Sequence, residues 1–267
     1  MENTPLEILV TNDDGYASKG IRVIADLLSR YGRVTVLAPE QVQSGMSAAV
    51  TLTRPIRVRR IESRQLPDCH PVEVHALTGT PVDCVKMAMN TFFLHRKPHL
   101  LVSGINHGSN ASVASVYSGT LGAAAEGTIY GVPSIGVSID DHDPQADFSG
   151  VEAWMGRILD NYLAAPPAAD VYLNINFPAL PPDRIRGVRF APQGKGMWVK
   201  EFSRRTDPHG NDYFWLTGEF LSLENEPVGD HMLLEQGYIT IVPHTLDNTR
   251  YPELERLSRT WKFDSVQ

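Results

Sequence analysis

Short apolar runs alternate with amphipathic stretches along the first two thirds of the chain. The run at 8–11 is followed, between 18 and 32, by apolar residues that recur every three or four positions, and a second run lies at 34–38. A strand, a helix and a strand joined by short connections form a βαβ unit with parallel strands. The pattern therefore predicts an α/β fold that is built on a Rossmann-like parallel sheet.

The same alternation continues as far as residue 177. Further strands are expected at 100–104, 134–139 and 171–177. The helices that precede or separate them are expected to begin at Thr80, Leu121 and Gly150. Shorter alternating runs between 50 and 77 predict instead an antiparallel excursion from the parallel core.

The character of the sequence changes after Pro178. Residues 179–236 hold many prolines, glycines and charges, and their short alternating runs predict an extended β-hairpin arm. Residues 237–267 return to a core strand and a closing helix. We therefore expect one domain that consists of a core (1–178), a hairpin arm (179–236) and a closing strand and helix (237–267).

Polar side chains follow three of the predicted strands at the point where each strand ends. Asp13 and Asp14 follow the first strand, Ser44 the second, and Asn106 the strand at 100–104. Because the carboxyl ends of parallel strands share one edge of a sheet, these side chains are expected to converge. Oxygen ligands without Cys or His favour Mg²⁺, Mn²⁺ or Ca²⁺ over zinc. Taken alone, the Asp-Asp-Gly sequence fits a solvated turn equally well.

A Ser-Gly-Thr turn, Ser118 to Thr120, opens the alanine-rich helix. Free backbone N–H groups and the helix dipole make such a helix start an anion site, although Ser118 or Thr120 would also serve as an ordinary helix cap. A cation site beside an anion site indicates phosphoryl chemistry, in which the metal polarises the phosphate and activates water. The joint arrangement favours this interpretation over a separate turn and cap.

Composition excludes several classes of protein. The net charge of the 267 residues is −7, which argues against binding to a nucleic-acid polymer. We expect a cytoplasmic protein, because the sequence shows no signal peptide or membrane-spanning run, and its two cysteines, Cys69 and Cys84, lack zinc-site spacing. No Gly-x-Gly-x-x-Gly follows the first strand, which argues against a dinucleotide-dependent oxidoreductase.

Six motifs, in order, resemble those of the stationary-phase survival protein (SurE) family. They lie at 10–15 (VTNDDG), 43–45 (QSG), 78–85 (TGTPVDCV), 103–110 (SGINHGSN), 117–120 (YSGT) and 174–178 (NINFP). The resemblance runs from about residue 6 to about residue 244. It implies a Rossmann-like core with a protruding C-terminal hairpin that is used for dimerisation.

The resemblance also implies an activity, namely metal-dependent hydrolysis of nucleoside 5'- and 3'-monophosphates. The family's metal ligands fall here on Asp13, Asp14, Ser44 and Asn106, the quartet at the predicted strand ends. We expect one Mg²⁺ or Mn²⁺ per subunit, with Asp13 or Asp14 orienting or deprotonating the water. The phosphate oxygens would be held by Asn110, Ser118, Gly119 and Thr120.

Three positions depart from the family pattern. Ser112 and Ala114 stand where glycine and aspartate are usual, and Gly229 stands where a Gly-Thr-Asp segment has threonine. These changes leave the substrate preference and the loop geometry open. His107 and His231 lie beside site residues and are expected to be exposed or hydrogen-bonded.

Two alternatives to a nucleotidase stay open from the sequence. A receiver-type signalling domain also carries acidic residues after its first strand and accepts phosphate, and a non-catalytic nucleotide-binding protein would bind without turnover. A further open point is the arm, whose aromatic residues need a covering surface. We expect a homodimer or a dimer of dimers that buries Trp215, and the alternative is an arm that closes over its own active site.

Overall fold

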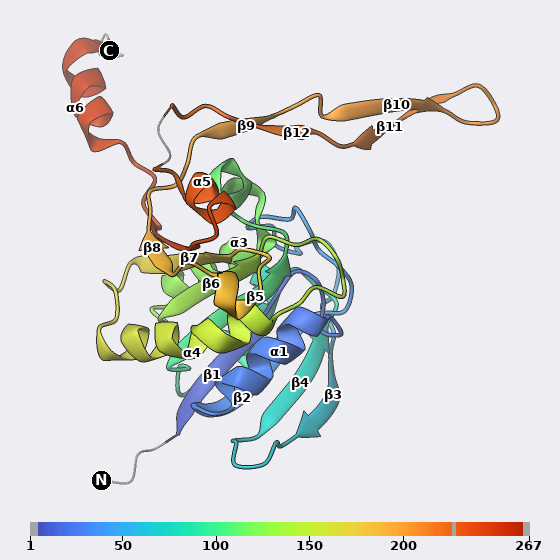
Figure 1. The fold of residues 1–267 in the computed structure, drawn as a ribbon, viewed down its shortest axis with the longest axis vertical. Helices are drawn as coiled ribbons and strands as arrows, with labels where there is room; N and C mark the ends of the chain where they lie inside the picture. Colours follow the sequence, from blue (N-terminus) through green and yellow to red (C-terminus); the bar gives the residue numbers. More distant parts are fainter. Residues whose placement is uncertain (1–4, 226–227, 264–267) are drawn as a thin grey trace.

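A mostly parallel sheet forms the centre of the molecule (Figure 1). The computed structural model describes residues 5–225 and 228–263, and within them this sheet has nine strands. In spatial order they are β3 (Val58–Arg64), β4 (Val72–Leu77), β2 (Gly32–Pro39), β1 (Leu6–Thr11), β5 (Leu100–His107), β6 (Ser134–Ile139), β7 (Val171–Phe177), β13 (Ile239–Thr245) and β8 (Val188–Phe190). The strands from β4 to β7 are mutually parallel, whereas β3 and β13 run antiparallel to their neighbours β4 and β7.

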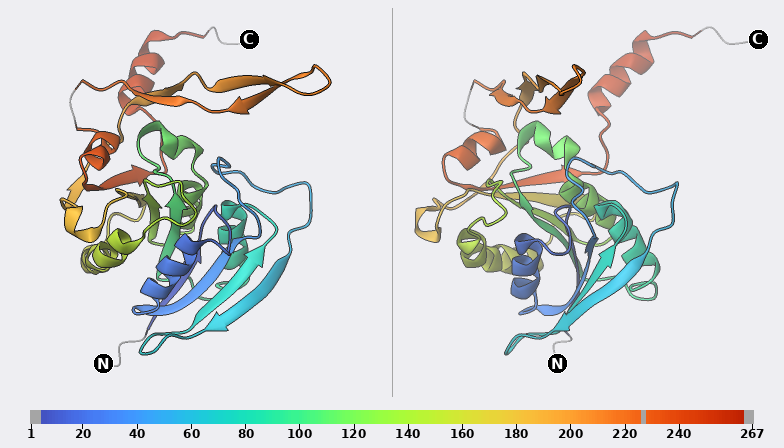
Figure 2. Two further views of the ribbon diagram at one scale, coloured as in Figure 1. Left: turned by 45° about the vertical axis from the view of Figure 1, so that its right-hand side comes forward. Right: turned by 90° about the vertical axis from the view of Figure 1, so that its right-hand side faces the viewer.

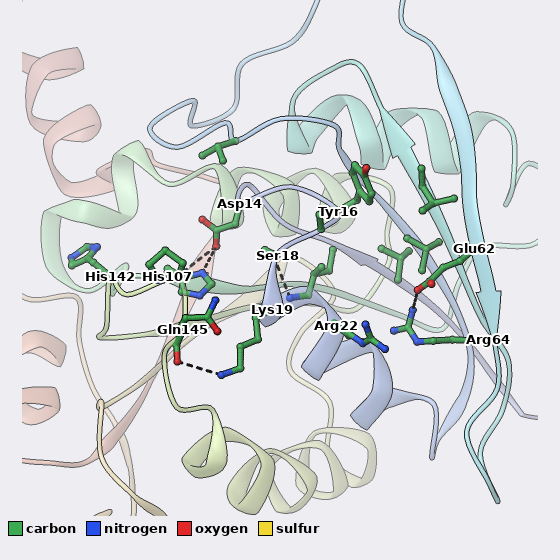
Figure 3. A pocket seen from close by; sticks show the side chains of 17 residues that line it. Asp14, Tyr16, Ser18, Lys19, Arg22, Glu62, Arg64, His107, His142 and Gln145 are labelled. Carbon is green, nitrogen blue, oxygen red and sulfur yellow. Dashed lines mark hydrogen bonds and ion pairs between the residues drawn. The ribbon is translucent and has the colours of Figure 1, made fainter.

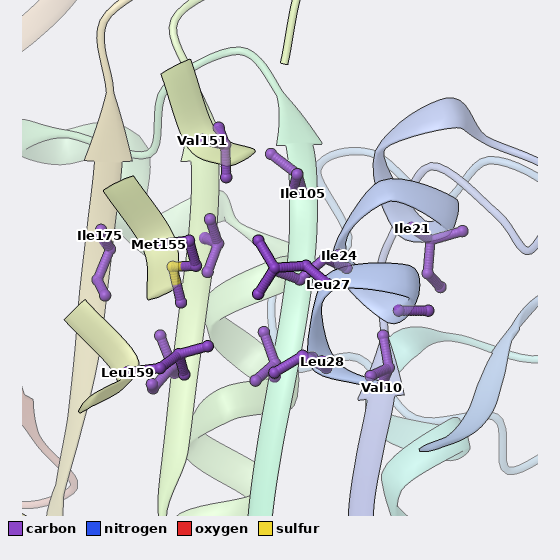
Figure 4. Packing of buried hydrophobic residues seen from close by; sticks show 14 of the residues in the cluster. Val10, Ile21, Ile24, Leu27, Leu28, Ile105, Val151, Met155, Leu159 and Ile175 are labelled. Carbon is purple, nitrogen blue, oxygen red and sulfur yellow. The ribbon is translucent and has the colours of Figure 1, made fainter. Parts of the chain in front are cut away.

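Helices cover both faces of the sheet. Successive residues of β1 point to opposite faces, so that Ile8 and Val10 belong to one buried cluster and Leu9 to the other. The first cluster includes the apolar faces of α1 (Lys19–Leu28) and α4 (Ser149–Ala164), which Figure 4 shows packed over the central strands. The second includes α2 (Pro81–Asn90) and α3 (Gly119–Ile129). The predicted α/β class is confirmed.

Helix caps form where the sequence placed them. Ser18 Oγ accepts a hydrogen bond from the backbone N–H of Ile21 at the start of α1. Thr80 and Asp83 form a reciprocal capping box at the start of α2. These local signals therefore fix where the chain turns from the sheet edge into each helix.

The predicted antiparallel excursion between 50 and 77 is only partly correct. β3 is antiparallel to β4, but β4 itself pairs in parallel with β2 and extends the main sheet. Five of the six residues of β4 are buried, because β4 lies between two strands, β3 and β2. Residues 50–57 contain no strand.

A long antiparallel ribbon crosses the molecule above the carboxyl ends of the strands (Figures 1 and 2). Its inner part pairs β9 (Gly196–Val199) with β12 (Glu219–Ser222), and its outer part pairs β10 (Phe202–Thr206) with β11 (Asp212–Leu216). The predicted hairpin arm is thus confirmed. Of the expected range 179–236, the ribbon takes 196–222, while β8 joins the main sheet and α5 (Asp230–Glu235) lies beside it.

Short helices and a separate C-terminal helix complete the chain. The 3₁₀ turns η1 (Ser112–Tyr117) and η2 (Pro182–Arg184) follow β5 and β7, respectively. Helix α6 (Tyr251–Thr260) stands away from the sheet in Figure 2 and buries none of its residues within the chain. In the described ranges, no helix has the length and apolar character needed to cross a membrane.

Candidate metal and phosphate site

The turn after β1 is built by the side chain of Asn12. Its Oδ1 accepts a hydrogen bond from Gly15 N at 3.2 Å, and its Nδ2 donates to Ser18 Oγ at 2.9 Å. Gly15 adopts a φ of +93°, which L-residues with side chains rarely tolerate. The backbone oxygen of Asp13 accepts a hydrogen bond from Gln43 N at 2.7 Å. This turn therefore holds both aspartates against the loop that follows β2.

Asp13 is a buried carboxylate, with 3% of its surface exposed. Its Oδ1 accepts a 2.6 Å hydrogen bond from Thr120 Oγ1. Burial raises the pKa of Asp13 to about 6; the charge of Asp14 also raises it, and the Thr120 hydroxyl acts in the opposite direction. Among residues 5–225 and 228–263, no lysine, arginine or histidine forms an ion pair with Asp13. A bound cation would supply the missing charge.

Asp14 is held by His107 (Figure 3). Its Oδ2 accepts hydrogen bonds from the backbone N of His107 at 3.1 Å and from the ring Nδ1 at 3.0 Å. The edge of this ring packs against Phe148 at 5.5 Å between centroids, and Lys19 Nζ lies 5.5 Å from the centre of the Phe148 ring. His107 is therefore hydrogen-bonded, as expected, and fixes the orientation of one carboxylate.

One cavity of about 510 Å³ gathers most of the predicted site residues. From the core, they are Asp13, Ser44, Asn106, Asn110 and Ser118. His107 and His142 line both this cavity and a neighbouring one of about 840 Å³, in which Asp14 lies (Figure 3). Three of the four predicted metal ligands, Asp13, Ser44 and Asn106, therefore meet in one cavity, whereas Asp14 lines only the neighbouring one.

Asn106 lines this cavity, and its side-chain nitrogen is already engaged within the chain. Its Nδ2 donates a 2.6 Å hydrogen bond to the backbone oxygen of Gly108. Ser44 is exposed in the loop after β2. No cluster of three or more His, Cys, Asp or Glu suited to a metal occurs in the described part of the chain, so a cation here would also need these hydroxyl and amide oxygens.

The start of α3 packs directly against Asp13. Ser118 is the N-cap, and its Oγ accepts a hydrogen bond from Leu121 N at 3.1 Å. Thr120 is fully buried and bonds to Asp13 instead of capping the helix. A Cβ placed on Gly119 would lie only 3.0 Å from Asp13 Cβ, so this position favours glycine. Gly119 and Thr120 therefore lie behind Asp13, whereas Ser118 lines the cavity.

Asn110 is fixed by polar residues of the neighbouring strands. Its backbone N donates to Asn176 Oδ1 at 2.7 Å, and its Nδ2 donates to Ser138 Oγ at 2.8 Å. Asn174 Nδ2 donates to the backbone oxygen of Asn110 at 2.9 Å. Sequence reasoning gives the motif 174–178 no role beyond the family resemblance, whereas in the structure its two asparagines hold Asn110 in place.

Two of the positions that depart from the family pattern, Ser112 and Gly229, lie next to one buried carboxylate, that of Asp230. Asp230 is fully buried and accepts hydrogen bonds from the backbone N of Ser112 at 3.0 Å and of Gly194 at 2.9 Å. Ser112 adopts a φ of +54° and donates through its Oγ to Gly194 O at 2.9 Å. Hydrogen bonds from the backbone N and from Oγ of Ser112 thus hold a side chain larger than glycine in the left-handed conformation here.

The hairpin also reaches the site, an arrangement that the sequence leaves open as an alternative to contact with another subunit. Four residues near the junction of the inner and outer parts of the ribbon line the 510 Å³ cavity: Trp198, Glu201, Leu216 and Thr217. β9 packs against η1, which follows β5. No local signal could have identified these residues, because their position depends on how the ribbon folds back over the sheet.

The chain is similar to proteins of one family along nearly its whole length. The family model "Survival protein SurE" matches residues 8–200. The "5'-nucleotidase SurE" proteins of Cytophaga hutchinsonii and Flavobacterium johnsoniae are each 41% identical to this chain, over 96% of it and 97% of their own length. The crystal structure of the SurE protein from Aquifex aeolicus superposes with a TM-score of 0.79 at 32% identity, covering 95% of this chain and 98% of that one. The chain therefore belongs to the SurE family.

Proposed function

We propose that this chain is a divalent-cation-dependent 5'-nucleotidase, a phosphomonoesterase that releases phosphate from nucleoside 5'-monophosphates and also from 3'-monophosphates. The observation that carries the proposal is the cavity in which Asp13, Ser44 and Asn106 meet the first turn of α3. The names of the relatives from Cytophaga hutchinsonii and Flavobacterium johnsoniae agree with it.

The residues of this cavity suit one Mg²⁺ or Mn²⁺ per subunit. Asp13, Asp14, Ser44 and Asn106 would hold it through oxygen atoms, which hard divalent cations prefer. The buried Asp13 carboxylate supports this assignment, because its charge is not paired with any cationic side chain among the described residues. When bound, such a cation supplies Lewis-acid polarisation of the phosphate and lowers the pKa of water.

The remaining residues would position the substrate and the water. The start of α3, with Ser118, would bind the phosphate oxygens together with Asn110 and stabilise the charge that develops on them. Gly119 allows this helix to approach Asp13. Thr120 keeps Asp13 in one orientation through its 2.6 Å hydrogen bond. Asp13 or Asp14 would orient or deprotonate the attacking water.

A phosphate-release panel tests the proposal. We expect the purified protein to release phosphate steadily from AMP or GMP with Mn²⁺ or Mg²⁺, and to stop when EDTA is added. Absence of turnover with every nucleotide and every divalent metal would refute it. Incubation with acetyl phosphate separates it from a receiver-type protein, which would accumulate a stable aspartyl phosphate.

The proposed assembly is a homodimer or a dimer of dimers in which the arm contacts another subunit. Trp215 is 63% exposed in the single chain, and Phe202 and Phe214 on the same ribbon are also exposed. Exposed aromatic surface of this kind is typical of a protein interface. Light scattering at low micromolar concentration should give at least twice the chain mass of 29.6 kDa. A folded, active monomer would contradict the proposal.

A further inference from the structure

The cavity that holds the predicted metal ligands has two different walls. The core contributes polar groups, including Asp13, Asn106 and Ser118. The turn before α3 adds the ring of Tyr117, and the hairpin adds the large apolar side chains of Trp198 and Leu216. Tyr117 is 56% exposed and Trp198 38% exposed, so both rings present surface to a ligand. A pocket with a few polar groups at one end and aromatic rings at the other fits an amphipathic small molecule.

Both aromatic residues are held in place by the fold. Tyr117 directly precedes Ser118, the N-cap of α3, and its backbone oxygen accepts a 3.1 Å hydrogen bond from Ser47 N. Trp198 packs edge-to-face on Phe220, its cross-strand partner, at 5.6 Å between ring centroids. Phe220 in turn packs on His231 at 5.2 Å, and His231 Nε2 lies 3.0 Å from Ser222 Oγ. The Trp198 ring therefore has a firm support behind it.

We propose that Tyr117 and Trp198 bind the base of the substrate, so that the inner end of the hairpin determines the preference for nucleotides over simple phosphate esters. The inference rests on the proposed nucleotidase function. A phosphate at the start of α3 lies one residue away from Tyr117, and a base that extends from it meets flat, uncharged ring surfaces. Stacking on such rings is the common way in which proteins hold a base without selecting its identity.

Glu201 is the ionisable residue that the ribbon adds to this wall. It is exposed and lines the cavity with Trp198. Its backbone oxygen accepts a hydrogen bond from Thr217 N at 2.7 Å, which fixes the position of its backbone. An ionised carboxylate only accepts hydrogen bonds, so its natural partners on a nucleoside are exocyclic amino groups and ribose hydroxyls.

The neighbouring cavity is a weaker candidate for the nucleoside. Two of its three Lys and Arg side chains already have partners in the protein (Figure 3). Lys19 donates to the backbone oxygens of Gln145 and Ala146, and Arg64 pairs with Asp26 and Glu62. Arg22, which also lines this cavity, is exposed on α1 and offers the most direct test of this alternative.

The experiment compares AMP with ribose 5-phosphate, which lacks the base. For Trp198→Ala we expect kcat/KM for AMP to fall at least about tenfold, mainly through KM, the scale of one lost base–aromatic stack. The value for ribose 5-phosphate should change less than about threefold, well under the effect of such a stack. Trp198→Phe should restore most of the discrimination, and Arg22→Ala should leave it unchanged.

Adenosine binding, measured by calorimetry with EDTA present, provides a readout that does not depend on turnover. Binding that weakens in Trp198→Ala and recovers in Trp198→Phe supports the base site, even if the proposed hydrolysis fails. The inference is overturned if Trp198→Ala weakens both substrates equally. It is also overturned if the affinity for adenosine is unchanged in Trp198→Ala, or if Arg22→Ala is the variant that removes the preference for AMP. Equal thermal stability of the variants excludes misfolding as the cause.

Discussion

Replacement of Asp13 by asparagine should stabilise the cation-free protein while it removes the activity. Burial raises the pKa of Asp13 to about 6, from the ordinary value of 3.8. The folded chain therefore binds this proton more tightly than the unfolded chain does. The resulting stabilisation is complete below pH 3.8 and is lost as the pH rises through 6.

The size of the effect follows from the same shift. A difference of about two pKa units corresponds to about 3 kcal/mol at pH 7.5, where Asp13 is ionised in both states. Asparagine has nearly the same shape and can still accept the hydrogen bond from Thr120 Oγ1. We therefore expect Asp13→Asn to raise the free energy of unfolding at pH 7.5 by up to about 3 kcal/mol, and to change it little near pH 4.

Urea denaturation with EDTA present, at pH 7.5 and near pH 4, measures this difference. Asp170→Asn is the control, because Asp170 is exposed and lies outside the cavity. Added Mn²⁺ should stabilise the unmodified protein and the control, but not Asp13→Asn, whose phosphate release should be nearly abolished. A variant that is less stable than the unmodified protein at pH 7.5 would refute a buried unpaired charge at this position. So would a difference in the free energy of unfolding between the two proteins that is the same at both pH values.

Three further changes test other contacts of the site. Thr120→Val should lower kcat markedly but lower the free energy of unfolding only slightly, because Ser118 caps α3 and Thr120 orients Asp13. The control Thr128→Val removes a hydroxyl bonded within the same helix and should leave kcat unchanged. His107→Phe should raise the Mn²⁺ concentration for half-maximal activity about 10- to 100-fold, since Asp14 loses its ring donor; an unchanged metal dependence would contradict this role. Mn²⁺ affinity, measured by calorimetry, should fall as the pH drops through 6, because protons then compete for Asp13; a constant affinity between pH 5 and 7.5 would count against Asp13 as a ligand.

The parallel core and the convergence of the strand ends could be predicted because both depend on local patterns. A buried run followed by a capped amphipathic helix, as from Ile8 to Leu28, leaves few alternatives to a βαβ unit. The direction of β4 could not be predicted in this way, since parallel and antiparallel partners bury the same residues. Periodicity determines which side chains are buried, whereas the choice of neighbour depends on long-range pairing.

The functional site shows the same division. The positions of Asp13, Ser44 and Asn106 follow from strand order, and one cavity collects all three. Whether Ser118 or Thr120 caps α3 could not be decided from their neighbouring positions, because either side chain is able to cap. The structure gives the cap to Ser118 and directs Thr120 to Asp13, a residue 107 positions away. Trp198 reaches the cavity through a similar long-range contact.

The Asp230 carboxylate joins two parts of the chain that would otherwise vary independently. It accepts hydrogen bonds from Ser112 in the loop that leads to α3, and from Gly194 at the root of the hairpin. The loop and the hairpin therefore depend on each other and can be exchanged between relatives only together. A chimaera that takes the hairpin of a relative must also take the loop at 111–118 and the segment around Asp230, or the grafted ribbon will meet a site loop shaped for another arm.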